Sequence, residues 1–106
     1  MDTLIAPVIS ALKENHASVN AEEVSRAFEV ARDAHEGQLR KSGEPYITHP
    51  VAVAEILAHL GLNPATIIAA LLHDTVEDTQ YSLVQLRLDF GDEIADLVDG
   101  VTKLDK

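Results

Sequence analysis

The stretch NPATIIAALLHD, from Asn63 to Asp74, constrains the fold most, because apolar residues occupy every side of the helix that it predicts. Asn63 is a typical cap residue, and Pro64 fits the first turn of a helix. A helix without a polar face must be covered by other elements all round, so we predict that it is the buried central helix. With 106 residues, the chain is long enough for one small domain and not for two.

The remainder of the chain is also helical in pattern. Apolar residues recur at helical spacing in residues 2–15, 21–35, 50–60, 82–90 and 92–106. Asn20 caps the second of these segments, and Ser82 with Gln85 resembles a capping box for the fourth. Residues 37–50 contain two glycines and two prolines without helical period and are predicted to form a loop. We predict an all-α helical bundle that is incomplete at its C-terminal end, where the pattern is still helical.

The composition excludes several classes of function. The formal net charge is −10, from 8 basic and 18 acidic residues, so a broad basic face for nucleic acid is not expected. The chain has no cysteine, which leaves any metal site to histidine and carboxylate ligands. No apolar run approaches the roughly 18 residues of a membrane span, and the acidic N-terminus does not resemble a signal peptide. We expect a cytoplasmic protein without a membrane partner.

Four ionisable residues lie within six positions where the apolar stretch ends. They are His73, Asp74, Glu77 and Asp78, in the string HDTVEDT. A divalent cation would neutralise the carboxylates and accept an imidazole nitrogen at the same time. Alternatively, His73 caps the last carbonyls of the helix and the acids are solvated, and this cluster alone does not decide between the two.

His49 provides a third candidate ligand. It lies in ITHP, between the predicted loop and Pro50, where a lone histidine is more often a helix cap or a surface residue. Together with the downstream His73–Asp74 doublet it completes a set of two imidazoles and one carboxylate. Such a set suits Mn, Fe, Ni or Zn better than Mg or Ca.

A histidine followed by a His-Asp doublet resembles the HD phosphohydrolase superfamily. The strings AHEGQLRKSGEPYITHPVAVAEILAHLGL, AALLHDTVEDT and FGDEIADLVDGVTKL are similar to the N-terminal hydrolase domain of the long RelA/SpoT homologues. The similarity covers residues 24–106. It implies that residues 1–106 are the N-terminal part of an HD-type hydrolase domain, with synthetase and regulatory domains downstream in the full-length protein.

The resemblance also implies residue roles. His49, His73 and Asp74 match three of the four protein ligands of the family's Mn²⁺, the fourth being an Asp that lies beyond residue 106. Glu77 and Asp78 match the acidic pair that positions and activates the attacking water. A carboxylate beside that water can orient it and take its proton.

The loop string LRKSG matches the part of the family that holds the guanine nucleotide. Arg40 and Lys41, with Ser42 beside them, are therefore expected to bind the substrate and to offset its repulsion by an acidic protein. Without the surrounding motif, these residues would be read as a solvated loop. His35 fits a packing or supporting role better than ligation. Tyr46 either packs over the nucleotide pocket or anchors the loop, and we expect the second.

The expected function is Mn²⁺-dependent hydrolysis of the 3′-diphosphate of (p)ppGpp to GDP or GTP plus diphosphate, in the stringent response. One alternative is a catalytically inactive, regulatory HD domain of a (p)ppGpp synthetase, although the visible part of the metal motif is intact. Another is an HD phosphatase of a different nucleotide. Without its fourth ligand, the 106-residue piece is expected to be inactive, and a homo-oligomer that covers apolar helix faces is compatible with it.

Overall fold

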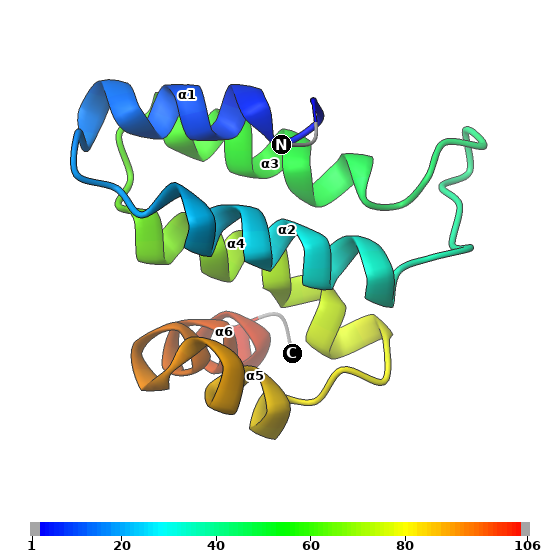
Figure 1. Ribbon diagram of the computed structural model, residues 1–106. Helices are drawn as coiled ribbons and strands as arrows, with labels where there is room; N and C mark the ends of the chain where they lie inside the picture. The colour runs from blue at the N-terminus through cyan, green and yellow to red at the C-terminus, as the bar shows by residue number, and fades with distance from the viewer. Residues whose placement is uncertain (1–2, 105–106) are drawn as a thin grey trace.

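The computed structural model of the protein describes residues 3–104, in which six α-helices and no strand are found. The helices are α1 (Ala6–Asn15), α2 (Ala21–Ala34), α3 (Thr48–His59), α4 (Pro64–Asp78), α5 (Leu83–Phe90) and α6 (Asp92–Leu104) (Figure 1). The predicted all-α fold is confirmed. None of these helices combines the length and apolar character that crossing a bilayer requires.

The predicted helix caps form as their side chains dictate. The side-chain oxygens of Asn20, Asn63 and Ser82 each accept a backbone N–H from the first turn of α2, α4 and α5. Each of these bonds satisfies an amide that would otherwise lack a helical partner. The backbone amide of Gln85 donates to the hydroxyl of Ser82, as in a capping box. The side-chain amide of Gln85 donates instead to Asp89 at 3.1 Å, so only the Ser82 half of the predicted capping box is observed.

Three helix boundaries differ from the prediction. The first helix begins at Ala6 and not at residue 2, which lies outside the described residues. α3 begins at Thr48, so that His49 lies inside its first turn. α4 continues one turn beyond the His-Asp doublet, because no glycine or proline interrupts it before Thr79, whose amide and hydroxyl both donate to the carbonyl of Thr75.

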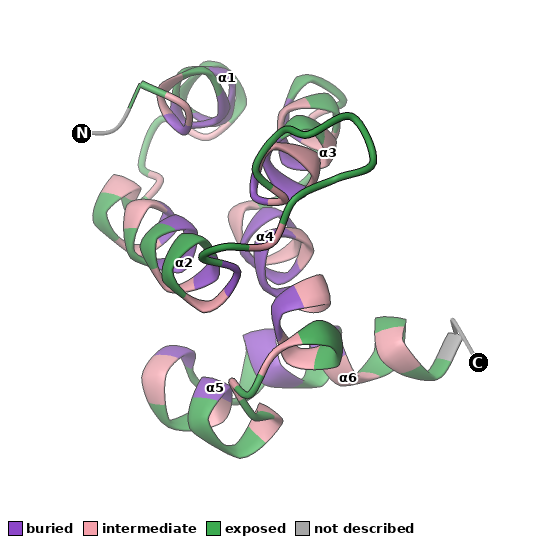
Figure 2. Ribbon diagram, turned by 90° about the vertical axis from the view of Figure 1, so that its right-hand side faces the viewer, coloured by how far each residue is buried: buried purple, intermediate pink, exposed green. Residues whose placement is uncertain are grey.

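The central position of α4 is confirmed. It packs against α2, α3 and α6, while α1 packs on α3 and α5 on α6 (Figure 1). In Figure 2 the buried residues of each helix face this centre. The buried residues of α4 are Ile67, Ile68, Ala69, Leu71, Leu72 and Thr75. Apolar side chains thereby pack against the C-terminal turns of α4 on several sides. This packing fixes the position of the helix at the residues that follow Leu72.

The loop between α2 and α3, residues 35–47, stands out from the bundle (Figure 1). Leu39 and Pro45 form an isolated antiparallel bridge, which closes the loop into a short hairpin-like turn. Gly43 has a φ of +91°, a left-handed conformation that side chains disfavour, and this allows the chain to reverse there. Residues 39–45 are all exposed, so the loop contributes little to the core.

Candidate metal centre

Three of the predicted site residues meet on one face of α4. Each of His73, Asp74 and Glu77 offers one ligand atom, and these atoms all lie within 4.8 Å of one another. Nδ1 of His73 lies 3.2 Å from Oδ1 of Asp74, and its Nε2 lies 3.3 Å from Oε2 of Glu77. Their side chains are 17%, 21% and 26% exposed. Counted as whole residues, His73 and Asp74 are half-buried, whereas Glu77 is exposed. The extra turn of α4 creates this arrangement, because it places Glu77 four residues after His73 on the same helix face.

The fourth member of the cluster comes from another helix. His49, in the first turn of α3, brings its Nε2 to 4.0 Å from Oδ2 of Asp74. Its side chain is 43% exposed, so the ring is accessible from solvent. Two imidazoles and two carboxylates therefore converge from α3 and α4, and this mixed nitrogen and oxygen donor set is one that a divalent transition metal accepts.

Tyr46 also contacts the cluster, which the sequence did not predict. Its hydroxyl donates to Oδ2 of Asp74 at 3.0 Å. Burial, this hydrogen bond and the negative charges of Asp74 and Asp78 raise the pKa of Tyr46 to about 12, although the positive charge of Arg40 acts against them. At neutral pH the side chain is a phenol and therefore a hydrogen-bond donor to the carboxylate.

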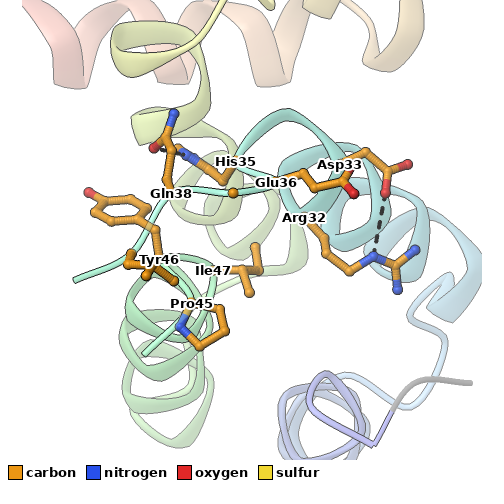
Figure 3. Close-up of a pocket in the computed structure, with 10 residues that line it drawn as sticks. Arg32, Asp33, His35, Glu36, Gln38, Pro45, Tyr46 and Ile47 are labelled. Carbon is orange, nitrogen blue, oxygen red and sulfur yellow. Dashed lines mark hydrogen bonds and ion pairs between the residues drawn. The ribbon is translucent and has the colours of Figure 1, made fainter. Parts of the chain in front are cut away.

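His35 lies behind Tyr46 and is 2% exposed. Its Nδ1 lies 3.0 Å from Oε1 of Gln38, its Nε2 lies 3.3 Å from Oγ1 of Thr75, and its ring centroid is 4.7 Å from that of Tyr46. Figure 3 shows the two rings side by side at the edge of a pocket of about 410 Å³, between the end of α2 and the loop. The predicted packing role of His35 is confirmed, and among residues 3–104 it joins no group able to hold a metal.

Asp78 is placed differently from Glu77. It is the last residue of α4, is exposed, and borders a shallow pocket beside Gln38 and Tyr81. Asp78 does not belong to the group that His73, Asp74 and Glu77 form. Its charge nevertheless reaches Tyr46, since it contributes to the raised pKa of that phenol.

The predicted substrate residues Arg40, Lys41 and Ser42 lie together on the exposed loop. They line a surface pocket with Leu39 and Tyr46. Tyr46 thus borders the loop pocket, and its hydroxyl contacts the metal-ligand candidate Asp74. The loop and the cluster are consequently neighbours in space.

A second pocket, of about 390 Å³, opens directly at the cluster. His49, His73 and Asp74 form its polar end, and the rest of its lining is mainly apolar: Pro50, Val53, Leu57, Thr66, Ala69, Ala70, Leu97 and Val101. In the sequence, Ile94, Leu97 and Val98 recur at helical spacing, which predicts that they share one apolar face of the last helix. Ile94 and Val98 are buried, but Leu97 is 37% exposed and lines this pocket.

Residues 27–106 match the family described as the HD domain. The chain belongs to the HD domain family. The predicted all-α HD-type fold agrees with this assignment, and the doublet His73–Asp74 that characterises such domains lies in the cluster described above.

The relatives of this HD domain are proteins of the RelA/SpoT type, which confirms the resemblance found in the sequence. A probable GTP pyrophosphokinase of Mycobacterium leprae is 57% identical over 97% of the chain. A guanosine-3′,5′-bis(diphosphate) 3′-pyrophosphohydrolase of Haemophilus influenzae is 64% identical over 73% of it. The bifunctional (p)ppGpp synthase/hydrolase SpoT of Escherichia coli K12 is 60% identical over 76%. The chain spans only 11–13% of the length of these relatives.

Proposed function

We propose that this HD domain is the hydrolase part of a RelA/SpoT-type protein and removes the 3′-diphosphate from (p)ppGpp, giving GDP or GTP plus diphosphate. The observation that carries the proposal is the approach of His49 on α3 to Asp74 on α4, at 4.0 Å, beside His73 and Glu77. The names of the Haemophilus and Escherichia relatives support the same reaction. Because the substrate is a free nucleotide, we place the protein in the cytoplasm.

His49, His73 and Asp74 would hold Mn²⁺ in this proposal, with an aspartate beyond residue 106 as a fourth ligand. The donor set supports this choice, since two imidazoles and a carboxylate suit a transition metal better than Mg²⁺ or Ca²⁺. The bound ion supplies Lewis acidity, which brings the pKa of a coordinated water towards neutrality and polarises a phosphoryl oxygen.

Glu77 would orient the attacking water and take its proton, because its carboxylate lies in the cluster and faces His73. Asp78, one residue further along α4, would complete the acidic pair. The water attacks the phosphorus that carries the 3′ oxygen, the bond between them breaks, and the 3′ oxygen leaves with a proton as the ribose hydroxyl. Diphosphate is the second product.

Arg40, Lys41 and Ser42 would bind the guanine nucleotide from the exposed loop. The protein carries a net charge of −10, so a polyanionic substrate needs positive charge placed locally. The guanidinium of Arg40 can pair with phosphate or stack on the base, and the ammonium of Lys41 adds a second positive charge. The position of Tyr46 between the loop pocket and Asp74 supports this division of roles.

A second candidate function is a regulatory HD domain of a (p)ppGpp synthetase. The Mycobacterium relative, named a probable GTP pyrophosphokinase, favours it. The presence of His49, His73 and Asp74 argues against it, because a purely regulatory domain does not need these metal-ligand candidates. A third candidate is an HD phosphatase of another nucleotide.

Metal analysis and a substrate screen on the full-length protein separate these candidates. We expect bound transition metal and release of diphosphate from ppGpp, but no hydrolysis of GTP, deoxynucleoside triphosphates or cyclic dinucleotides. A protein that binds no transition metal at neutral pH would indicate the regulatory domain. Turnover of another nucleotide in preference to ppGpp would indicate the third candidate.

A further inference from the structure

We propose that Tyr46 is a positioning residue of the metal centre, whose hydroxyl holds the carboxylate of Asp74 in the orientation of a metal ligand, and that His35 holds Tyr46 in place. The proposal rests on the proposed function, because it assigns Asp74 to the metal. It gives Tyr46 a role toward Asp74 that the sequence alone did not predict.

The hydrogen bond from Tyr46 fixes one oxygen of Asp74. Oδ2 accepts this bond at 3.0 Å, and Oδ1 lies 3.2 Å from Nδ1 of His73. An aspartate side chain has two rotatable bonds, and anchoring one oxygen determines where the other points. Groups that hydrogen-bond to metal-ligating carboxylates in this way set the geometry of the site and raise its affinity for the ion.

Tyr46 is itself held from several sides. Its ring centroid lies 4.7 Å from that of His35 and 5.9 Å from that of His49. Its backbone amide donates to the carbonyl of Gln38 at 2.9 Å, across the neck of the loop. The hydroxyl is thus presented to Asp74 by a side chain whose ring and backbone are both anchored.

His35 closes the network back onto α4. Its two ring nitrogens are occupied by Gln38 and by Thr75, and Thr75 directly follows Asp74 in the sequence. Contacts therefore run from Asp74 to Tyr46, from Tyr46 to His35, and from His35 to Thr75, linking the end of α2, the loop and α4. A closed network of this kind restrains each member more strongly than a single hydrogen bond does.

The alternative is that Tyr46 only anchors the loop, and two matched substitutions in the full-length protein separate the two roles. Tyr46→Phe keeps the ring and its packing but removes the hydroxyl. Tyr81→Phe removes an equivalent bond, from the Tyr81 hydroxyl to Oδ2 of Asp89 at 2.7 Å, at a place away from the cluster. Both variants lose one tyrosine–aspartate hydrogen bond, so both should lower the thermal midpoint of the metal-free protein.

The measurements are the Mn²⁺ dissociation constant by calorimetry and the electron paramagnetic resonance spectrum of the bound Mn²⁺. Tyr46→Phe should weaken Mn²⁺ binding by about 10- to 100-fold and change the spectrum. Tyr81→Phe should leave both unchanged. If the unsubstituted protein binds Mn²⁺ and hydrolyses ppGpp, but Tyr46→Phe has the same affinity and spectrum, Tyr46 is not a positioning residue. If the unsubstituted protein binds no Mn²⁺, the proposed function fails and this inference fails with it.

Discussion

Nε2 of His35 on the α2–α3 loop and Oγ1 of Thr75 on α4 lie 3.3 Å apart, and these two residues are the buried polar ones of the core in residues 3–104. These two atoms are hydrogen-bonding partners across 40 positions of sequence. A buried polar group without a partner costs free energy, whereas a paired one is tolerated. The pair thus joins the exposed loop that carries Arg40 to the helix that carries Asp74 and Glu77.

Replacing Thr75 with valine should test this pair. The substitution keeps the shape of the side chain but leaves Nε2 of His35 without its hydroxyl partner, so the free energy of unfolding should fall by about 1–3 kcal/mol. Urea unfolding followed by circular dichroism gives this value. Thr48→Val is the control, because the Thr48 hydroxyl bonds the carbonyl of Pro45 at an exposed position. Equal losses in the two variants would contradict the special role of the buried pair.

Replacing Glu77 with glutamine should abolish hydrolysis of ppGpp in the full-length protein. The amide cannot take a proton from water, and general-base catalysis contributes a factor of about 10²–10⁴ to the rate. Nucleotide binding, measured by calorimetry, should remain largely intact. Glu55→Gln is the matched control, since Glu55 pairs with His59 on the exposed side of α3, 3.6 Å away. Hydrolysis at the unsubstituted rate in Glu77→Gln would rule out the assigned role.

Replacing Arg40 with glutamine should raise the KM for ppGpp without changing the Mn²⁺ affinity. Loss of one charge-assisted hydrogen bond corresponds to roughly 10- to 100-fold in binding. Arg32→Gln serves as the control, because Arg32 is also exposed and pairs with Asp33 at 3.5 Å. Steady-state kinetics over a range of ppGpp concentrations would expose the difference. A KM that changes equally in the two variants would argue against nucleotide binding by the loop.

In the folded, metal-free chain, the two tyrosines should ionise at a higher pH than free tyrosine does. Burial and hydrogen bonds to aspartate raise the pKa of Tyr46 from its ordinary value of 10.0 to about 12, and they raise the pKa of Tyr81 as well. Folding therefore favours the protonated phenols. This contribution to stability is complete below pH 10 and is lost as the pH rises from there towards the folded-state pKa values.

The near-ultraviolet absorbance of tyrosinate measures this directly, because the 106-residue chain contains two tyrosines and no tryptophan. Below the pH at which the helical circular dichroism is lost, little tyrosinate should form, whereas in concentrated urea both side chains should ionise near pH 10. Ionisation near pH 10 while the helices persist would show that the two hydrogen bonds are not made in solution.

The sequence predicted the features that depend on local chemistry. Caps such as Asn20 and Asn63 and the apolar periodicity of α4 are encoded within a few residues, and the structure confirms them. The end of α4 was predicted one turn too early, because ionisable residues after an apolar run were taken to mark the helix end. In the structure they continue the helix and bring Glu77 onto the face of His73.

Features that depend on tertiary packing were harder to predict. Tyr46 lies in an aperiodic loop, and its partner Asp74 is 28 positions away, so no local pattern could reveal their hydrogen bond. The approach of His49 to Asp74 was expected from the family resemblance and not from spacing alone. The exposure of Leu97 likewise depends on which helices pack against α6, and periodicity does not contain that information.

The exposed hairpin-like loop and the enclosed helix α4 differ in how much sequence change they tolerate. Residues 39–45 contribute almost nothing to the core, so substitutions there alter the outer wall of the site at little cost in folding. The histidine, aspartate and glutamate of α4 are carried by a helix that tolerates few changes. The loop can therefore change in sequence while the histidine, aspartate and glutamate of α4 stay as they are.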